Sequence, residues 1–260
     1  MSPPVPLAPY IYILGVYLAL QVVLNLFLRY VIRQHDENRA VAMLLGTFWA
    51  GVVNAVFFII AAVMLHVIGA APNVASIPGN VWLLALSGIP AGVALWYISV
   101  QARKLGIALF GGGELIAGED AILRIPPHPR YITAGMLNLG VLQPLGREFF
   151  MRGALLPAVA AVVAQNSTEI AGWLWAILVV LVLELLLRMN VVWMFQTLAY
   201  ALIMCGLFIL TGCALTGLVA AMVNGMLHGM ALAYMGQQDL KRKLLELSEE
   251  AQSSTDEPTE

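Results

Sequence analysis

The chain is organised around the stretch Pro144-Leu145-Gly146-Arg147-Glu148-Phe149-Phe150-Met151-Arg152-Gly153-Ala154-Leu155-Leu156-Pro157. It places three ionisable side chains in the middle of one of the chain's long apolar runs. On a helix, Glu148 and Arg152 are four residues apart, so they share a face and can pair. Charged groups inside a bilayer are costly, and by default they mark a functional site that faces the protein interior. We therefore expect the other apolar runs to form a scaffold around this stretch.

The composition is that of an integral membrane protein. Hydrophobic residues make up 61% of the chain and charged residues 11%, whereas about a quarter of the residues in a soluble domain are charged. The net charge of -2 says little about partners, because in membrane proteins the placement of charge carries the information. The sequence predicts an all-α fold, a polytopic bundle of about seven transmembrane helices.

Seven apolar runs are long enough to cross the hydrocarbon as helices. They are residues 10–32, 40–69, 80–101, 131–164, 171–187, 190–211 and 213–236. The fourth would reach about 50 Å as a straight helix, which is too long for one crossing. We count it as one net crossing, with a kink at Pro144 or a part beyond the membrane.

The basic residues predict the orientation. With the N-terminus outside, the inner connections and tail hold every Lys and Arg except Arg147 and Arg152, and the outer segments 1–9, 70–79 and 165–170 hold none. This is the bias of the positive-inside rule. A topology with eight crossings, in which the fourth run crosses twice, is the second choice, because it would put Lys241, Arg242 and Lys243 outside. We expect a prokaryotic plasma membrane, with a cytoplasmic C-terminus.

The chain divides into three parts. Residues 1–130 form a three-span region that ends in a cytoplasmic loop, 102–130; residues 131–237 form a four-span core; residues 238–260 form a tail that starts as an amphipathic helix and ends disordered. The basic residues at 241–243 suit contact with anionic membrane lipids. The loop has glycines and His128 but neither a phosphate-binding pattern nor a spaced set of metal ligands. We expect no cofactor, no metal and no nucleic-acid partner.

Polar side chains on four different spans lie at similar depths. Measured from the outer helix ends, these depths are about 18–24 Å for Glu148, Arg152, Glu184, Gln196 and His228. Because buried charges need partners, we expect these side chains to form one cluster, with Arg147 either joining it or reaching for the inner interface.

Two interpretations of this layer remain open. In the structural one, the pair Glu148–Arg152 and a second pair, Glu184–Arg188, neutralise each other, while Gln196 and Asn224 supply hydrogen bonds between helices. In the functional one, a carboxylate and an imidazole converge to polarise water for attack on a peptide carbonyl.

The run Glu148-x-x-x-Arg152-Gly153, preceded by Pro144 and followed by Pro157, resembles motif 1 of the CPBP family, the CAAX-protease and bacteriocin-processing intramembrane endopeptidases. The resemblance covers the last half of the chain. The family motif reads Glu-Glu-x-x-x-Arg, and it implies that the first glutamate activates the attacking water. Here Arg147 occupies that position.

The other two family motifs are incomplete. The motif Phe-x-x-x-His should fall on the fifth span, where by spacing its histidine position lies near Glu184. On the sixth span, Phe195 is followed four residues later by Ala199 instead of a histidine. For His-x-x-x-Asn, which follows a Thr-Gly signature, Thr211-Gly212 implies a histidine near Ala221 and an asparagine near Asn224 or Gly225. His228 lies further along, and the fourth residue after it is Leu232.

The resemblance implies two hypotheses. The favoured one is a catalytically degenerate homologue, a pseudoenzyme that binds a membrane peptide or a lipidated protein. The alternative is an active peptidase in which Glu148 or Glu184 is the base, His228 stabilises the oxyanion and Arg152 orients the carboxylate. A small-solute transporter is a third reading of the polar layer, although the chain has no internal repeat.

Overall fold

The structure, a computed structural model, describes residues 6–34, 38–69, 81–111, 122–123, 129–188 and 193–255. The described residues form helices and short connections without a strand. The elements are α1 (Ala8–Gln34), α2 (Arg39–Val67), α3 (Val81–Phe110), α5 (Pro129–Leu137), η2 (Asn138–Leu142), α6 (Gln143–Glu148), η3 (Phe149–Leu155), α7 (Leu156–Ala164), α8 (Glu169–Arg188), α9 (Met194–Thr211) and α10 (Ala214–Thr255). Each predicted span corresponds to one helical run, so the predicted all-α bundle is confirmed.

Six of the described helices are long and apolar enough to cross a membrane: α1, α2, α3, α8, α9 and the first part of α10. The remaining run, residues 129–164, is one uninterrupted succession of α5, η2, α6, η3 and α7. With so many apolar helices, the protein is embedded in a membrane.

Two π-helical segments, η2 and η3, interrupt the regular geometry of the fourth run, where the sequence predicted either a kink at Pro144 or a part beyond the membrane. Pro144 lies two residues after η2, and Pro157 lies two residues after η3. A proline lacks the N–H of an α-helical hydrogen bond and its ring clashes with the carbonyl four residues earlier. The wider turn of a π segment accommodates this clash, so the helix continues past both prolines.

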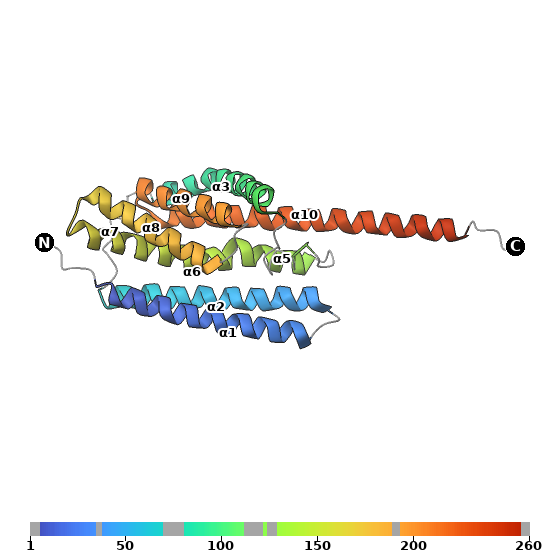
Figure 1. Ribbon diagram of the computed structural model, residues 1–260, viewed down its shortest axis with the longest axis horizontal. Coiled ribbons are helices and arrows are strands. Elements are labelled where there is room, and N and C mark those ends of the chain that lie inside the picture. Colours follow the sequence, from blue (N-terminus) through green and yellow to red (C-terminus); the bar gives the residue numbers. More distant parts are fainter. Residues whose placement is uncertain are drawn as a thin grey trace.

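The helices form layers around the fourth run (Figure 1). The α1–α2 hairpin lies on one side of it, and α3, α9 and α10 lie on the other; α8 packs against α7. Small residues allow the closest approaches, because Gly146 faces the backbone of Ala55 in α2, and Gly225 in α10 faces the backbone of Leu139 and Gly140. The fourth run is therefore the centre of the bundle.

Two predicted boundaries shift. Helix α3 continues to Phe110, so the first part of the predicted loop 102–130 is helical, and His128 lies outside the described residues. Helix α10 passes the predicted end of the last span and runs to Thr255, projecting beyond the bundle (Figure 1). The predicted helical start of the tail is therefore correct, and the helix includes residues 253–255, which the sequence analysis placed in a disordered end.

Candidate functional site

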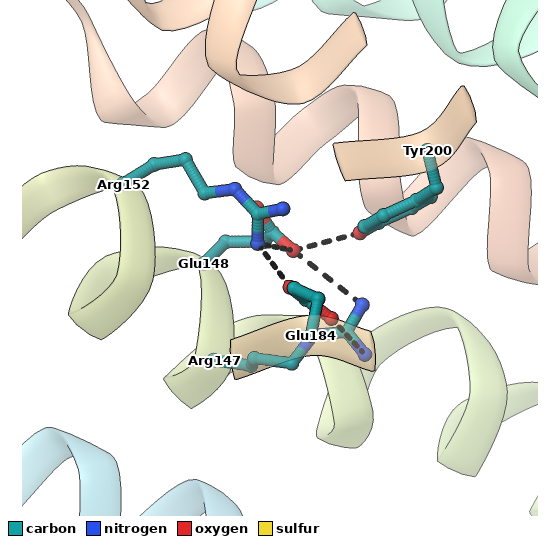
Figure 2. Close-up of polar contacts among 5 residues, drawn as sticks. All are labelled: Arg147, Glu148, Arg152, Glu184 and Tyr200. Atoms are coloured by element: carbon teal, nitrogen blue, oxygen red, sulfur yellow. Dashed lines mark hydrogen bonds and ion pairs between the residues drawn. The ribbon is translucent and has the colours of Figure 1, made fainter. Parts of the chain in front are cut away.

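Five side chains from three helical runs meet in the interior of the bundle (Figure 2). Arg147 and Glu148 come from α6, Arg152 from η3, Glu184 from α8 and Tyr200 from α9. We call these five residues the charge cluster. Glu148, Arg152 and Glu184 are each only 1% exposed, so water at the surface of the bundle does not screen their charges.

Arg152 connects the two carboxylates. Its Nη1 atom lies 2.7 Å from Glu184 Oε1 and 3.2 Å from Glu148 Oε1. Glu148 and Arg152 are four residues apart on the same run, as predicted, and the contact with Glu184 joins the fourth run to α8. The predicted convergence of Glu148, Arg152 and Glu184 is thus observed.

Arg147 joins the same cluster, which resolves the alternative left open by the sequence. Its guanidinium lies 3.5 Å from Glu148 Oε1 and 3.8 Å from Glu184 Oε2. These distances are longer than those made by Arg152, and the Arg147 side chain is 18% exposed. Arg147 is therefore the outer and more loosely held cation.

Tyr200 is a member of the cluster that the sequence analysis missed. Its hydroxyl donates a hydrogen bond of 2.7 Å to Glu148 Oε1, and its ring lies 5.1 Å from the Arg147 guanidinium carbon and 5.6 Å from that of Arg152. A signal was present, because Tyr200 is four residues after Gln196 and shares its helix face. A tyrosine in an apolar run, however, gives no sign of whether it faces lipid or the interior.

The cluster is electrically balanced, with two arginines against two glutamates. Each carboxylate has both cations within 4 Å, and Glu148 also accepts the hydrogen bond from Tyr200. Burying such a pair costs desolvation energy that only good geometry and further hydrogen bonds offset. The arrangement links the fourth run to α8 and α9 through ion pairs and a hydrogen bond.

His228 does not lie at the level of the charge cluster. Its neighbour Gly229 faces Met136, and Gly225 faces Leu139 and Gly140. Met136 is twelve residues before Glu148, which is about 18 Å along a helix. Because α10 packs antiparallel to the fourth run, His228 thus lies at the level of Met136 and not at that of Glu148.

Three other positions that the sequence analysis singled out are Gln196, Arg188 and Ala221. Gln196 is buried in α9, one turn before Tyr200. The side chain of Arg188, predicted to pair with Glu184, lies outside the described part of the structure, and Glu184 pairs with Arg147 and Arg152. Ala221, where the family motif implies a histidine, is buried in the same apolar cluster as Tyr200. A methyl group at this position offers no proton-transfer chemistry.

Comparison of the chain with protein-family models, with curated proteins and with solved structures found no match. Among the described residues, no three side chains of His, Cys, Asp or Glu are grouped so that they could hold a metal ion.

Proposed function

We propose that this integral membrane protein is a catalytically degenerate relative of the CPBP-family intramembrane endopeptidases, which binds a membrane-proximal peptide or a lipidated protein without cutting it. The observation that carries the proposal is the pairing of both buried carboxylates with Arg147 and Arg152.

A general base must be free to take a proton from water. Glu148 instead directs Oε1 at two guanidinium groups and a tyrosine hydroxyl. This oxygen is therefore occupied by protein donors and is not open to a water molecule. Arg147 stands where the family motif has its first glutamate, so the substitution turns a base into a cation that holds the neighbouring glutamate.

One observation favours the alternative, an active peptidase. Glu148 Oε2 is buried and has no hydrogen-bond partner among the described residues, so this oxygen is available to a water molecule. In that case Glu148 would be the base, and Arg152 would orient it through Oε1.

A cleavage assay separates the two functions. Purified protein in detergent is incubated with a library of apolar peptides and lipidated C-terminal peptides, and the products are identified by mass spectrometry. We expect no cleavage beyond that of the Glu148→Gln variant. The matched control is Glu169→Gln, which changes an exposed glutamate in α8. Cleavage by the wild type and the control, but not by Glu148→Gln, would establish the peptidase.

Binding is tested by crosslinking within the membrane. A photoreactive amino acid is placed at Gln143, an exposed position one turn before Arg147. The control position is Leu210, which is 85% exposed and lies in the last turn of α9. We expect one defined product from position 143 only. The identified partner, once purified, should bind the wild type more tightly than Arg147→Gln. Equal crosslinking from both positions would contradict a specific site.

A further inference from the structure

Polar atoms without a protein partner are concentrated at the charge cluster. Among the described residues, nine buried side-chain atoms make no hydrogen bond, and six of them belong to the cluster or to the adjoining turn of α9: Arg147 Nε, Glu148 Oε2, Arg152 Nε and Nη2, Gln196 Oε1 and Thr197 Oγ1. The set contains both donors and acceptors. Water is a ligand that satisfies both kinds of group, and buried water bonds to otherwise unpaired polar atoms.

The unpaired atoms of Arg152 lie on one edge of its guanidinium group. Nη1 is used by both carboxylates, while Nε and Nη2 form the opposite edge, and Figure 2 shows Nη2 directed away from Glu184. Arg152 is 1% exposed, so this edge does not reach the solvent around the bundle. The thiol of Cys205, a weak acceptor, lies against Arg152, and no oxygen atom of the described residues accepts a hydrogen bond from Nε or Nη2.

The unpaired atoms continue from the cluster towards one end of α9. Gln196 and Thr197 lie one turn before Tyr200, and both are buried. Helix α9 begins at Met194, so Tyr200 is about 9 Å from the end of the helix. Two side-chain pairs flank this end, Arg103 over the Trp193 ring at 4.2 Å and the stacked rings of Phe110 and Phe195 at 6.1 Å. Gln196 and Thr197 thus form a short row of polar side chains on α9, between its first turn and Tyr200, whose hydroxyl bonds Glu148.

We infer that the charge cluster is a water-binding site that fills from the side of the membrane on which α9 begins, along Gln196 and Thr197. Water molecules in this row accept hydrogen bonds from Arg152 and donate them to Glu148 Oε2 and Gln196 Oε1. The inference concerns solvent access alone and holds whether or not the protein binds the proposed partner.

The test measures the reaction of introduced thiols with a charged, membrane-impermeant methanethiosulfonate reagent, because the reaction requires a thiolate in contact with water. Cys205 and Cys213 are first replaced by alanine in the full chain. Thr197→Cys and Gln196→Cys then place thiols in the row. The control is Ala199→Cys, which lies at almost the same depth and, two residues from Thr197, on the other side of the helix. Gln238→Cys, exposed on the projecting part of α10, marks the side of the membrane on which α9 begins.

In sealed vesicles we expect Thr197→Cys to react at least about tenfold faster than Ala199→Cys, and only with reagent on the side from which Gln238→Cys reacts. A rate equal to that of Ala199→Cys, or reaction from the opposite side only, would overturn the inference. Each variant is checked by size-exclusion chromatography, and if Thr197→Cys does not fold, Gln196→Cys is held to the same two criteria, with Leu198→Cys, two residues away on the other side of the helix, as its control.

Discussion

Arg152 makes the two shortest ion pairs in the charge cluster, because one nitrogen atom serves both Glu148 and Glu184. Its loss would leave Arg147, whose ion pairs are longer, as the cation of the cluster. The contribution of each cationic residue to stability can therefore be ranked from distance and exposure.

Replacing Arg152 with alanine should lower the free energy of unfolding by about 3–5 kcal/mol, because it leaves buried charge uncompensated. Arg242→Ala is the control, since Arg242 pairs with Asp239 at 2.6 Å but is 70% exposed; this change should cost less than about 1 kcal/mol. Thermal unfolding in detergent measures both. Equal melting temperatures for the two variants would show that the cluster does not stabilise the fold.

Removing the Tyr200 hydroxyl tests the hydrogen bond that the sequence did not reveal. Tyr200→Phe keeps the ring and should cost about 1.5–3 kcal/mol, the usual range for a hydrogen bond to a charged group. In the Glu148→Gln background the same change should cost less, because the acceptor is then neutral. The comparison is a double-mutant cycle read by thermal unfolding. Additive losses would mean that the two side chains do not interact.

The meeting of Glu148, Arg152 and Glu184 could be predicted because charges within apolar spans must find each other. The position of His228 could not. Depth was counted from the outer ends of the helices, as though these ends were level. In the structure Ala214, the first residue of α10, faces Gly153, whereas α7 continues to Ala164. Helix α10 thus begins deeper than α7 ends, and His228 lies correspondingly further from the cluster.

At the level of elements, the apolar runs predicted the helices, while their internal geometry came from packing. Pro144 indicated a kink in the fourth run or a part beyond the membrane, but nothing in the sequence distinguishes a kink from the π segments η2 and η3. The crossing of α10 over the fourth run depends on glycines, whose role is visible only once the partner backbone is in place.

Gly225 should not tolerate a side chain. A Cβ atom there would overlap the Leu139 carbonyl group, which is backbone and cannot turn away, so Gly225→Ala should cost about 1–3 kcal/mol through overpacking. Gly206 in α9 is the matched control, because no atom lies within 4 Å of the point that a Cβ atom would occupy there. Gly206→Ala should be neutral or stabilise the protein by up to about 1 kcal/mol. Similar melting temperatures for the two variants would contradict this close crossing.

For the whole molecule, the structure bears on the number of times the fourth run crosses the membrane. Residues 129–164 are helical without interruption, and a chain that crossed twice would have to turn back within this range. Helix α10 projects from the end of the bundle that lies away from the turn between α7 and α8 (Figure 1). Basic residues gather at that end, Arg103 in the last turns of α3 and Arg242 beyond the bundle in α10.

The orientation and the single crossing are tested together by reporter fusions. We expect alkaline phosphatase, which is active only outside the plasma membrane, to be active when fused after Ser167, in the connection between α7 and α8, and inactive when fused after Thr255. Green fluorescent protein should show the reverse. The reason is that three spans precede the fourth run, so one further crossing from an outer N-terminus carries residue 167 outside, while three more return the chain. If the fourth run crossed twice, the same N-terminus would put residue 167 inside and Thr255 outside. That reversed pattern would refute the topology and place the basic residues of α10 on the unfavoured side.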